Sequence, residues 1–212
     1  MPLILHNTPN SDCEWAVWKV TESPEDQLKR LQELGIYAEV PFFRNPNRLS
    51  EWLTARLLLS EMGVKQRIRY DEAGKPHLEG DGSVSISLSH SSGHVAAIKH
   101  SKRSTGIDIE KTGDRILKVS HKFVGPDEEA WIRTGSDDQL VQFYRIWGAK
   151  ECAFKIYGRG GVDFRANLFV EPPSISPSEP TLVTLRKQEI TCQYHVFFEY
   201  LDDMILTYGF EV

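Results

Sequence analysis

The sequence predicts an α+β fold built from two related halves, and two patterns support the mixed architecture. Alternating apolar and polar residues, typical of strands, occur at residues 13–20, 83–90, 94–100, 182–187, 193–200 and 204–212. Helical patterns lie between these segments, most clearly at residues 23–35, 46–62 and 138–158. Strands and helices in both parts of the chain therefore indicate an α+β architecture.

A repeated spacing indicates that the two halves are related. Trp52 precedes Gly63 by eleven residues, and Trp147 precedes Gly158 by the same interval. A repeat of this kind predicts a duplicated unit. We therefore expect an N-terminal and a C-terminal half, residues 1–103 and 104–212. The interface between such halves is a natural place for an active site.

The N-terminal helices carry recognisable start and stop signals. In the first helix, Ser23 fits the N-cap, Pro24 occupies the first turn, and Gly35 follows the last turn. The second helix, residues 46–62, is expected to end at Gly63. A turn-rich stretch then leads to the paired strands near residue 90.

The C-terminal half opens with a short strand at residues 104–111, followed by a helical piece around 114–121. We expect residues 123–129 to form a loop, because glycine and proline interrupt the pattern there. The longest helix of the chain, residues 138–158, comes next, and strands complete the half.

Composition excludes several classes of protein. The 212 residues carry a formal net charge of -5, so a general nucleic-acid binder with a basic stripe is not expected. The start of the chain lacks a signal-peptide pattern, and no apolar run reaches the roughly 20 residues of a membrane helix. Three cysteines without metal-type spacing argue against a disulfide scaffold. We expect a cytoplasmic protein without membrane segments.

Two carboxylates lie side by side on a predicted strand. In the segment from Gly106 to Glu110, side chains alternate, so Ile107 and Ile109 face one way while Asp108 and Glu110 face the other. A solvated strand face is the plain alternative for such a pair. A third carboxylate on the long helix favours the functional interpretation.

That third carboxylate interrupts an apolar stripe. The stripe has helical spacing and consists of Leu140, Phe143, Tyr144, Trp147, Glu151, Phe154 and Lys155. A charged pair on an apolar stripe costs desolvation unless it meets a partner, metal or ligand. An ordinary surface pair is the alternative, worth only about 0.2–0.5 kcal/mol. Asp108, Glu110 and Glu151 together could supply three hard oxygen ligands for Mg²⁺.

A third cluster combines basic, hydroxyl and imidazole groups. Lys75 stands beside a turn, and the following strand ends in Ser89-His90-Ser91. Such groups at a strand end bind phosphate oxygens. A hydrolase is disfavoured, since adjacent serine and histidine rarely face each other and no GxSxG elbow is present.

These clusters, in this order, resemble the 4'-phosphopantetheinyl transferase superfamily, and specifically its larger, surfactin-synthetase-activating type with two pseudo-repeated halves in one chain. The resemblance covers about residues 48–160 and rests on four motifs: Gly74-Lys75-Pro76, Ser87-Leu88-Ser89-His90-Ser91, Thr105-Gly106-Ile107-Asp108-Ile109-Glu110, and Trp147-Gly148-Ala149-Lys150-Glu151-Cys152-Ala153-Phe154-Lys155. Ser87 and Gly148 depart from the residues frequent at their positions.

The resemblance implies a role for each matched residue. It implies that Asp108, Glu110 and Glu151 bind Mg²⁺, and that Lys155 lies near the pyrophosphate of coenzyme A, which is the substrate. It places further contacts to coenzyme A in the N-terminal half, at Lys75, Ser89, His90 and Arg56, with Arg48 as an additional candidate. It also matches Glu128 to an acidic position near the active site.

The implied reaction moves the 4'-phosphopantetheine arm of coenzyme A onto a serine of an acyl or peptidyl carrier protein and releases 3',5'-ADP. The candidate base is Glu151, acting directly or through a metal-bound water, and Glu128 is the alternate. Two other functions stay open: a non-catalytic module that binds coenzyme A or a carrier protein, and another magnesium-dependent diphosphate enzyme such as a nucleotide pyrophosphatase.

The carrier protein implied by the resemblance is an acidic helical bundle, so docking needs a basic or apolar patch. The helix around 114–121 offers one, with Arg115, Lys118, His121 and Lys122 on or beside it. A solvated helix face is the alternative for these charges. We expect the enzyme to act as a monomer.

Overall fold

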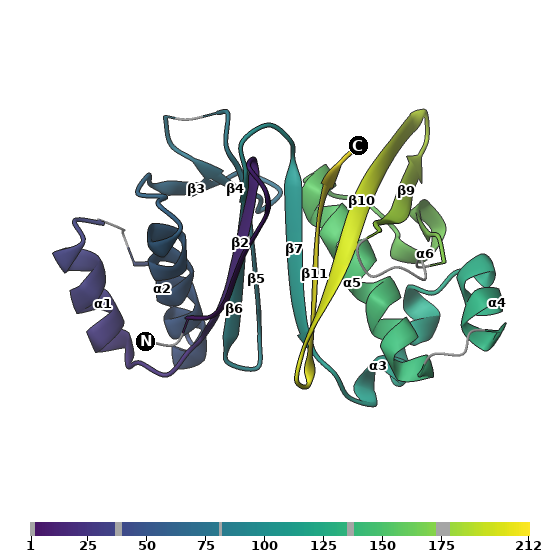
Figure 1. The fold of residues 1–212 in the computed structure, drawn as a ribbon, viewed down its shortest axis with the longest axis horizontal. Coiled ribbons are helices and arrows are strands. Elements are labelled where there is room, and N and C mark those ends of the chain that lie inside the picture. The colour runs from purple at the N-terminus through teal and green to yellow at the C-terminus, as the bar shows by residue number, and fades with distance from the viewer. Residues whose placement is uncertain (1–2, 37–39, 81, 135–137, 173–178) are drawn as a thin grey trace. The chain divides into compact units, whose positions relative to one another are not determined.

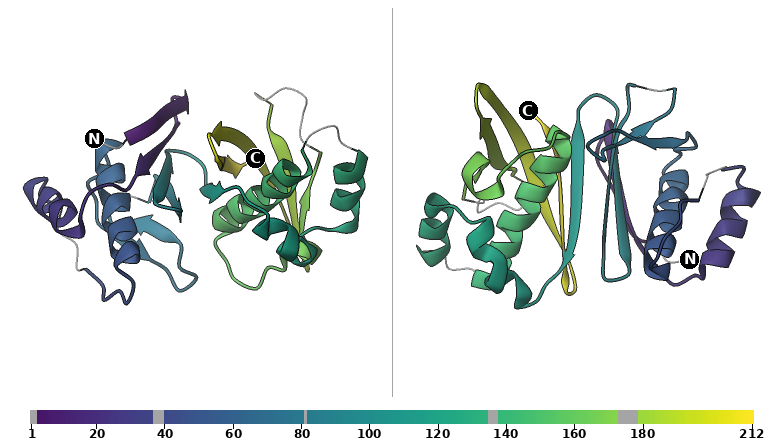
Figure 2. Two further views of the ribbon diagram at one scale, coloured as in Figure 1. Left: turned by 90° about the horizontal axis from the view of Figure 1, so that it is seen from below. Right: turned by 180° about the vertical axis from the view of Figure 1, so that it is seen from behind.

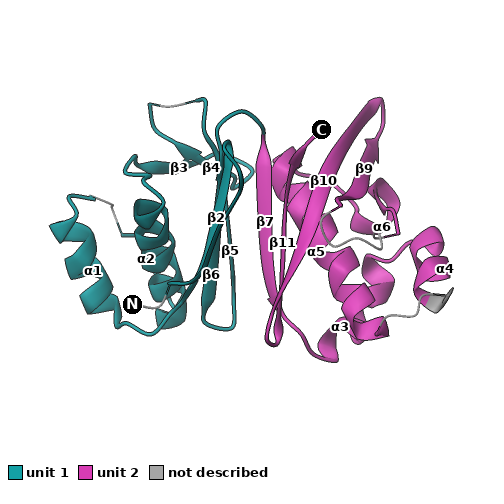
Figure 3. Ribbon diagram, in the orientation of Figure 1, with its two compact units in different colours: residues 1–103 teal, residues 104–212 magenta. Residues whose placement is uncertain are grey.

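The computed structural model describes residues 3–36, 40–80, 82–134, 138–172 and 179–212. The chain divides into two compact units, residues 1–103 (unit 1) and 104–212 (unit 2) (Figure 3). Each unit combines one antiparallel sheet with helices. The predicted α+β fold is therefore confirmed.

Unit 1 contains a six-stranded sheet with the strand order β1-β2-β6-β5-β4-β3 (Figure 1). Its strands are β1 (Leu3–Asn10), β2 (Cys13–Lys19), β3 (Ile68–Tyr70), β4 (Pro76–Leu78), β5 (Ser85–Ser91) and β6 (His94–His100). Strands β2 and β6 are the most buried, because α2 covers one of their faces, while the edge strand β1 is largely exposed.

Helix α2 (Pro46–Glu61) packs on β2 and β6, and α1 (Pro24–Glu33) packs on α2. Ser23 caps α1 by accepting from the backbone N–H of Asp26, as the sequence predicts. Helix α2 ends before Gly63, which has a φ of +79°. Glycine adopts this left-handed conformation without strain, whereas other residues rarely do. The core between α2 and the sheet includes Trp18 and Leu58, both fully buried.

Unit 2 contains a five-stranded sheet with the order β7-β11-β10-β9-β8. Its strands are β7 (Thr105–Lys111), β8 (Leu168–Val170), β9 (Thr181–Lys187), β10 (Ile190–Leu201) and β11 (Met204–Glu211). Its helices are α3 (Arg115–Val119), the 3-10 turn η1 (Ser120–Lys122), α4 (Pro126–Thr134), α5 (Gln139–Tyr157) and α6 (Phe164–Asn167).

Helix α5 lies along one face of this sheet, against β7 and β11 (Figure 2). Two glycines allow the close approach. A Cβ atom on Gly106 of β7 would stand 2.4 Å from the carbonyl oxygen of Cys152, and one on Gly148 of α5 would stand 2.3 Å from Thr207 Oγ1. Contacts this short are incompatible with a side chain, so both positions require glycine in this packing.

One local prediction was wrong, and one strand was not predicted. Residues 123–129 were expected to form a loop, but α4 begins at Pro126, where proline fits the first turn and the acidic residues Asp127 and Glu129 complement the helix dipole. Strand β1 was not predicted, because most of its side chains are exposed and its sequence lacks the apolar alternation of a half-buried strand.

Among the described residues, no helix is both long and apolar enough to cross a membrane.

Candidate active site

The strand β7 presents Asp108 and Glu110 on the face that α5 covers. Asp108 is 5% exposed, and its Oδ1 accepts a hydrogen bond from Lys155 Nζ at 2.8 Å. The same ammonium group donates to the carbonyl oxygen of Ile107 at 2.8 Å. Lys155 therefore joins the last turns of α5 to the strand that carries the carboxylates.

Glu151, one helical turn before Lys155, lies close enough to both strand carboxylates to feel their charge. Partial burial, followed by the negative charge of Asp108, raises the pKa of Glu151 to about 7, with a smaller contribution from Glu110 and an opposing one from Lys155. A carboxyl group with such a pKa changes its protonation near neutral pH. The structure thus brings Asp108, Glu110, Glu151 and Lys155 into one cluster.

The predicted apolar stripe of α5 is not its most buried face. The most buried side chains of the helix include Ile146, Ala149, Cys152, Ala153 and Ile156. Most residues of the predicted stripe, Glu151 and Lys155 among them, are partly buried beside that face. The charged pair therefore lies at the border of the core, where its desolvation is smaller than on a fully buried stripe.

Glu128 is part of a separate, buried ion pair. Its Oε2 accepts from Lys150 Nζ at 2.7 Å and from the backbone N–H of Gly125 at 2.7 Å, and its Oε1 accepts from the N–H of Val170 at 3.0 Å. Glu128 is 3% exposed and Lys150 is fully buried. Burial lowers the pKa of Lys150, and the charge of Glu128 opposes this shift. Because both oxygens of Glu128 already accept hydrogen bonds inside the protein, this carboxylate fixes the backbone around it and is poorly placed to receive a proton from an external substrate.

Trp147 links the aromatic core of unit 2 to the carboxylate cluster. Its Nε1 donates to Glu110 Oε1 at 3.2 Å. Its ring packs against Phe123 with a centroid distance of 5.1 Å and against Phe164 at 5.6 Å. The indole therefore has one polar contact toward the cluster and two aromatic contacts away from it.

The donor set of the cluster suits a hard divalent cation, because it consists of three carboxylates whose mutual repulsion such a cation would relieve. Burial is the largest cause of the raised pKa of Glu151, and repulsion by Asp108 and, less strongly, by Glu110 adds to it. Within the described part of the chain, however, no group of three or more His, Cys, Asp or Glu side chains is arranged to hold a metal ion. Asp108 is instead paired with Lys155, and Glu110 with Trp147.

In unit 1, Arg48 and His90 meet at a polar cavity of about 590 Å³. Arg48 Nη1 makes a hydrogen bond to the His90 ring, and Glu51 Oε2 lies 3.6 Å from Arg48 Nη1 and 3.4 Å from His90 Nδ1. Asn45, the N-cap of α2, lines the same cavity. The positive end of a 16-residue helix and a guanidinium group favour an anion in this cavity, whereas the carboxylates of Glu22 and Glu51, which also line it, oppose one.

The other predicted contacts of unit 1 are not in that cavity. Arg56 is 7% exposed, stacks over the Trp52 ring at 3.2 Å, and lines a different cavity of about 290 Å³ together with Tyr70. Lys75 lies in the tight turn before β4, where its backbone N–H donates to Asp71 Oδ1 at 2.9 Å. Ser89 is 9% exposed on β5. The structure thus brings together Arg48 and His90 but places Arg56 elsewhere.

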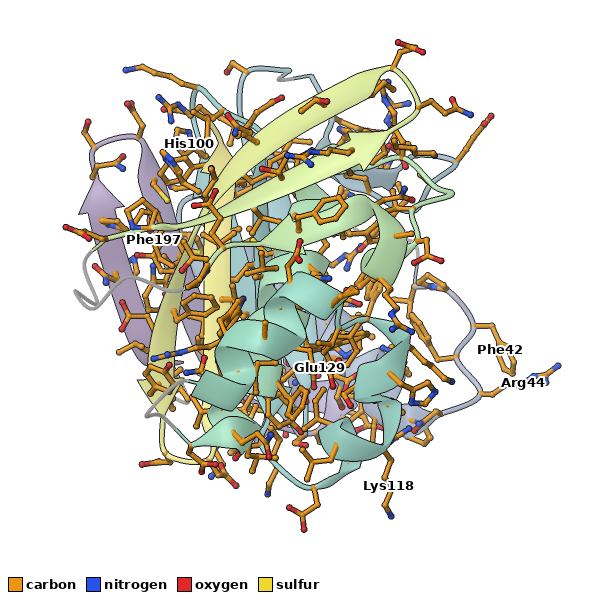
Figure 4. The ribbon with its side chains drawn as sticks, turned by 90° about the vertical axis from the view of Figure 1, so that its right-hand side faces the viewer. Phe42, Arg44, His100, Lys118, Glu129 and Phe197 are labelled. Atoms are coloured by element: carbon orange, nitrogen blue, oxygen red, sulfur yellow. The ribbon has the colours of Figure 1, made fainter. Side chains whose placement is uncertain are left out.

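A basic surface of unit 2 lies beside the cluster. We call it the α3 surface; it consists of Arg115, Lys118, His121 and Lys122. Lys118 points away from the rest of the ribbon (Figure 4). The adjoining cavity, of about 420 Å³, is lined by Ile116, Val119 and Phe123 from this region and by Glu110 and Trp147 from the cluster.

Two features of the site were not predicted from the sequence. Lys150 lies in the motif from Trp147 to Lys155, but no role was predicted for it. A lysine among the apolar residues Ile146, Ala149 and Ala153 indicates a buried charge that needs a partner. Glu51, which faces both Arg48 and His90, carried no signal, because an acidic residue one turn into a helix is common.

Comparison with known proteins connects unit 2 to one family. Residues 104–208 match the description "4'-phosphopantetheinyl transferase superfamily". The chain is 28% identical over 116 residues to the 4'-phosphopantetheinyl transferase gsp of Aneurinibacillus migulanus, covering 53% of this chain and 48% of that protein. It is 28% identical over 142 residues to AcpT of Salmonella typhimurium, covering 65% and 74%. It is 31% identical over 99 residues to Sfp of Bacillus subtilis, covering 45% and 44%. The matched region thus spans about half the length of gsp and Sfp.

Proposed function

Because the chain belongs to the 4'-phosphopantetheinyl transferase superfamily, we propose that it transfers the 4'-phosphopantetheine group of coenzyme A to a serine of an apo acyl or peptidyl carrier protein. The observation that carries the proposal is the cluster of Asp108, Glu110, Glu151 and Lys155 between β7 and α5. Its carboxylates and ammonium group suit a reaction at a diphosphate.

The proposed reaction is a phosphoryl transfer. The serine Oγ forms a bond to the β-phosphorus of coenzyme A, the bond from that phosphorus to the bridging oxygen breaks, and 3',5'-ADP leaves with that oxygen. The serine proton passes to the carboxylate of Glu151. In the metal-free protein, partial burial and then the charge of Asp108 raise the pKa of Glu151 to about 7. Bound Mg²⁺ would favour the ionised carboxylate, so in this proposal Glu151 takes the proton on an oxygen that the metal would leave free, or through a water.

Mg²⁺ is part of the proposal, with Asp108, Glu110 and Glu151 as the residues that would hold it. When bound, it would supply positive charge beside the diphosphate. Lys155 adds a fixed positive charge from this chain, and its Nζ, now 2.8 Å from Asp108, is the group that we assign to a diphosphate oxygen.

We assign the binding of coenzyme A to unit 1, through Arg48, His90, Lys75, Ser89 and Arg56. The shared cavity at the start of α2, with the N-terminal end of that helix and the Arg48 guanidinium group, supports Arg48 and His90 as contacts to a phosphate group. Arg56 lines the second cavity, so it would contact a different part of coenzyme A from Arg48 and His90. In this scheme unit 1 supplies coenzyme A contacts and unit 2 supplies the carboxylates.

The α3 surface is our candidate for carrier docking. Its basic side chains would complement an acidic carrier, and the apolar residues Ile116, Val119 and Phe123 of the neighbouring cavity offer contact area. The same cavity reaches Glu110, so a carrier bound there would lie near the cluster. A cytoplasmic monomer completes the proposal, and the free Cys13, Cys152 and Cys192 suit a reducing compartment.

The alternative function for the same fold is a module that binds coenzyme A or a carrier protein without catalysing the transfer. The presence of all three carboxylates favours the enzyme. To decide, the purified chain is incubated with coenzyme A, Mg²⁺ and a panel of apo-carriers, and each carrier is weighed by mass spectrometry. The proposal expects a gain of one phosphopantetheine on at least one carrier. Tight binding of a carrier without any mass gain would support the binding module.

A further inference from the structure

We propose that the buried ion pair of Lys150 and Glu128 is a positioning element for the active site, which holds the Trp147 indole against Glu110. The effect on transfer rests on the proposed function; the effect on Trp147 does not.

All three donors of the Lys150 ammonium group are used inside the protein. Nζ donates to Glu128 Oε2 at 2.7 Å, to the carbonyl oxygen of Phe123 at 2.6 Å, and to the carbonyl oxygen of Phe164 at 2.8 Å. The side chain is fully buried. An ammonium group has three N–H bonds, so these contacts fix its position and leave no donor for a substrate.

Glu128 extends the same network to two further segments. It accepts from the backbone N–H groups of Gly125 and Val170, which precede α4 and end β8. The ion pair therefore joins three pieces of backbone: the connection from Phe123 to the start of α4, the start of α6 at Phe164, and the end of β8. A network that spans several segments fixes their separation more strictly than apolar packing does.

The two carbonyl groups held by Lys150 belong to the residues whose rings enclose Trp147. The Phe123 ring meets the indole edge-on, at 61° between the planes, and the Phe164 ring meets it at 41°. Because Lys150 fixes the backbone of both phenylalanines, it also fixes the slot in which the indole lies. The indole Nε1 then donates to Glu110 Oε1.

Stability alone does not account for this pair. Replacing a buried ion pair by apolar residues of similar size is often neutral or stabilising, because both charges lose their hydration. An ion pair beside a catalytic cluster is better explained by the geometry it imposes on Trp147 and, through it, on Glu110. In this account Glu128 acts through backbone and Lys150, and it does not receive the serine proton.

The direct test is the NMR signal of the Trp147 indole N–H, assigned by its loss in Trp147→Phe. In the double variant Lys150→Met/Glu128→Gln, which removes both buried charges together, we expect this signal to shift or broaden while the other indole signals stay in place. Lys187→Met is the matched control, because Lys187 Nζ also donates to a loop carbonyl, that of Gly160, at 2.8 Å. It should leave the Trp147 signal unchanged.

A second variant covers the case in which the double variant does not fold. Phe164→Leu keeps the carbonyl group that Lys150 contacts but removes one ring of the slot. It should shift the Trp147 signal in the same way. An unchanged Trp147 signal in whichever of the two variants is folded would overturn the proposal.

Transfer kinetics test whether the ion pair affects the proposed reaction. The double variant should lower kcat by about 10- to 100-fold, the scale for loss of an outer partner of an active-site ligand, with the KM for coenzyme A changed less than about twofold. Adding Trp147→Phe should cost little more, since both changes break the same link. If Trp147→Phe instead lowers kcat by the same factor in the double variant as it does in the parent, the two changes act independently and the proposal is contradicted. If the parent chain itself transfers nothing, the proposed function fails, while the NMR result still decides the positioning of Trp147.

Discussion

Replacing Glu151 by glutamine should stabilise the metal-free protein at alkaline pH, although Glu151 is assigned to the active site. Partial burial, then the charge of Asp108 and, less strongly, that of Glu110 raise the pKa of Glu151 to about 7, from 4.5 for an ordinary glutamate. In the unfolded chain the carboxyl group ionises near 4.5. Between these values the folded protein binds one more proton than the unfolded chain, so its stability falls as the pH rises.

The magnitude follows from the shift. One pKa unit corresponds to about 1.4 kcal/mol, so the shift of Glu151 from 4.5 to about 7 corresponds to at most about 3.5 kcal/mol. Relaxation around a partly buried group reduces this value, and we expect about 1.5–3 kcal/mol at pH 8. Glutamine has nearly the shape of the protonated acid and cannot ionise. Glu151→Gln should therefore lie within about 1 kcal/mol of the parent at pH 5, where the unfolded carboxyl group has begun to ionise, and exceed the parent's stability by more at pH 8.

Urea unfolding at pH 5 and pH 8, in the presence of a chelator, measures both differences. Glu129→Gln is the control, because Glu129 is an exposed carboxylate on α4 (Figure 4), and its replacement should change stability by less than about 0.5 kcal/mol at either pH. The account of the carboxylate cluster would be refuted if Glu151→Gln were less stable than the parent at pH 8. It would also be refuted if the difference in unfolding free energy between variant and parent were the same at pH 5 and pH 8.

Three further predictions concern single positions. Asp108→Ala should fold but lose Mg²⁺-dependent transfer, measured with and without chelator; full activity in excess chelator would show that Asp108 holds no essential metal. Arg48→Ala and Lys75→Ala should weaken coenzyme A binding in calorimetry, by about tenfold for one lost charge-assisted contact, and unchanged binding in both would remove coenzyme A from unit 1. Gly106→Ala should destabilise unit 2 by about 1–3 kcal/mol in thermal unfolding, because its Cβ would meet the carbonyl oxygen of Cys152 at 2.4 Å; a neutral change would show that α5 can move away from β7.

The sequence predicted the features that depend on local pattern. The caps of α1, the extent of α5 and the shared face of Asp108 and Glu110 on β7 all follow from capping signals and from strand or helix periodicity. The family predicted from four motifs is confirmed by the match over residues 104–208 and by the similarity to gsp and Sfp.

The remaining features depend on contacts between distant segments, which a single sequence does not show. The partner of Lys150 is 22 residues away in the chain, and the carbonyl of Phe123 is 27 residues away. Trp147 reaches Glu110 across 37 residues. Helix α4 was missed because Gly125 and Pro126, read as loop residues, in fact mark a helix start.

The most direct test of the central claim is a single-turnover measurement that follows both products. Chain, coenzyme A and Mg²⁺ are mixed with an apo-carrier identified by mass spectrometry, and 3',5'-ADP and modified carrier are quantified over time. The account predicts that the two products appear together in equal amounts, that neither appears without the carrier, and that Asp108→Ala forms neither. Release of 3',5'-ADP without a carrier, or transfer by Asp108→Ala at the parent rate, would contradict it.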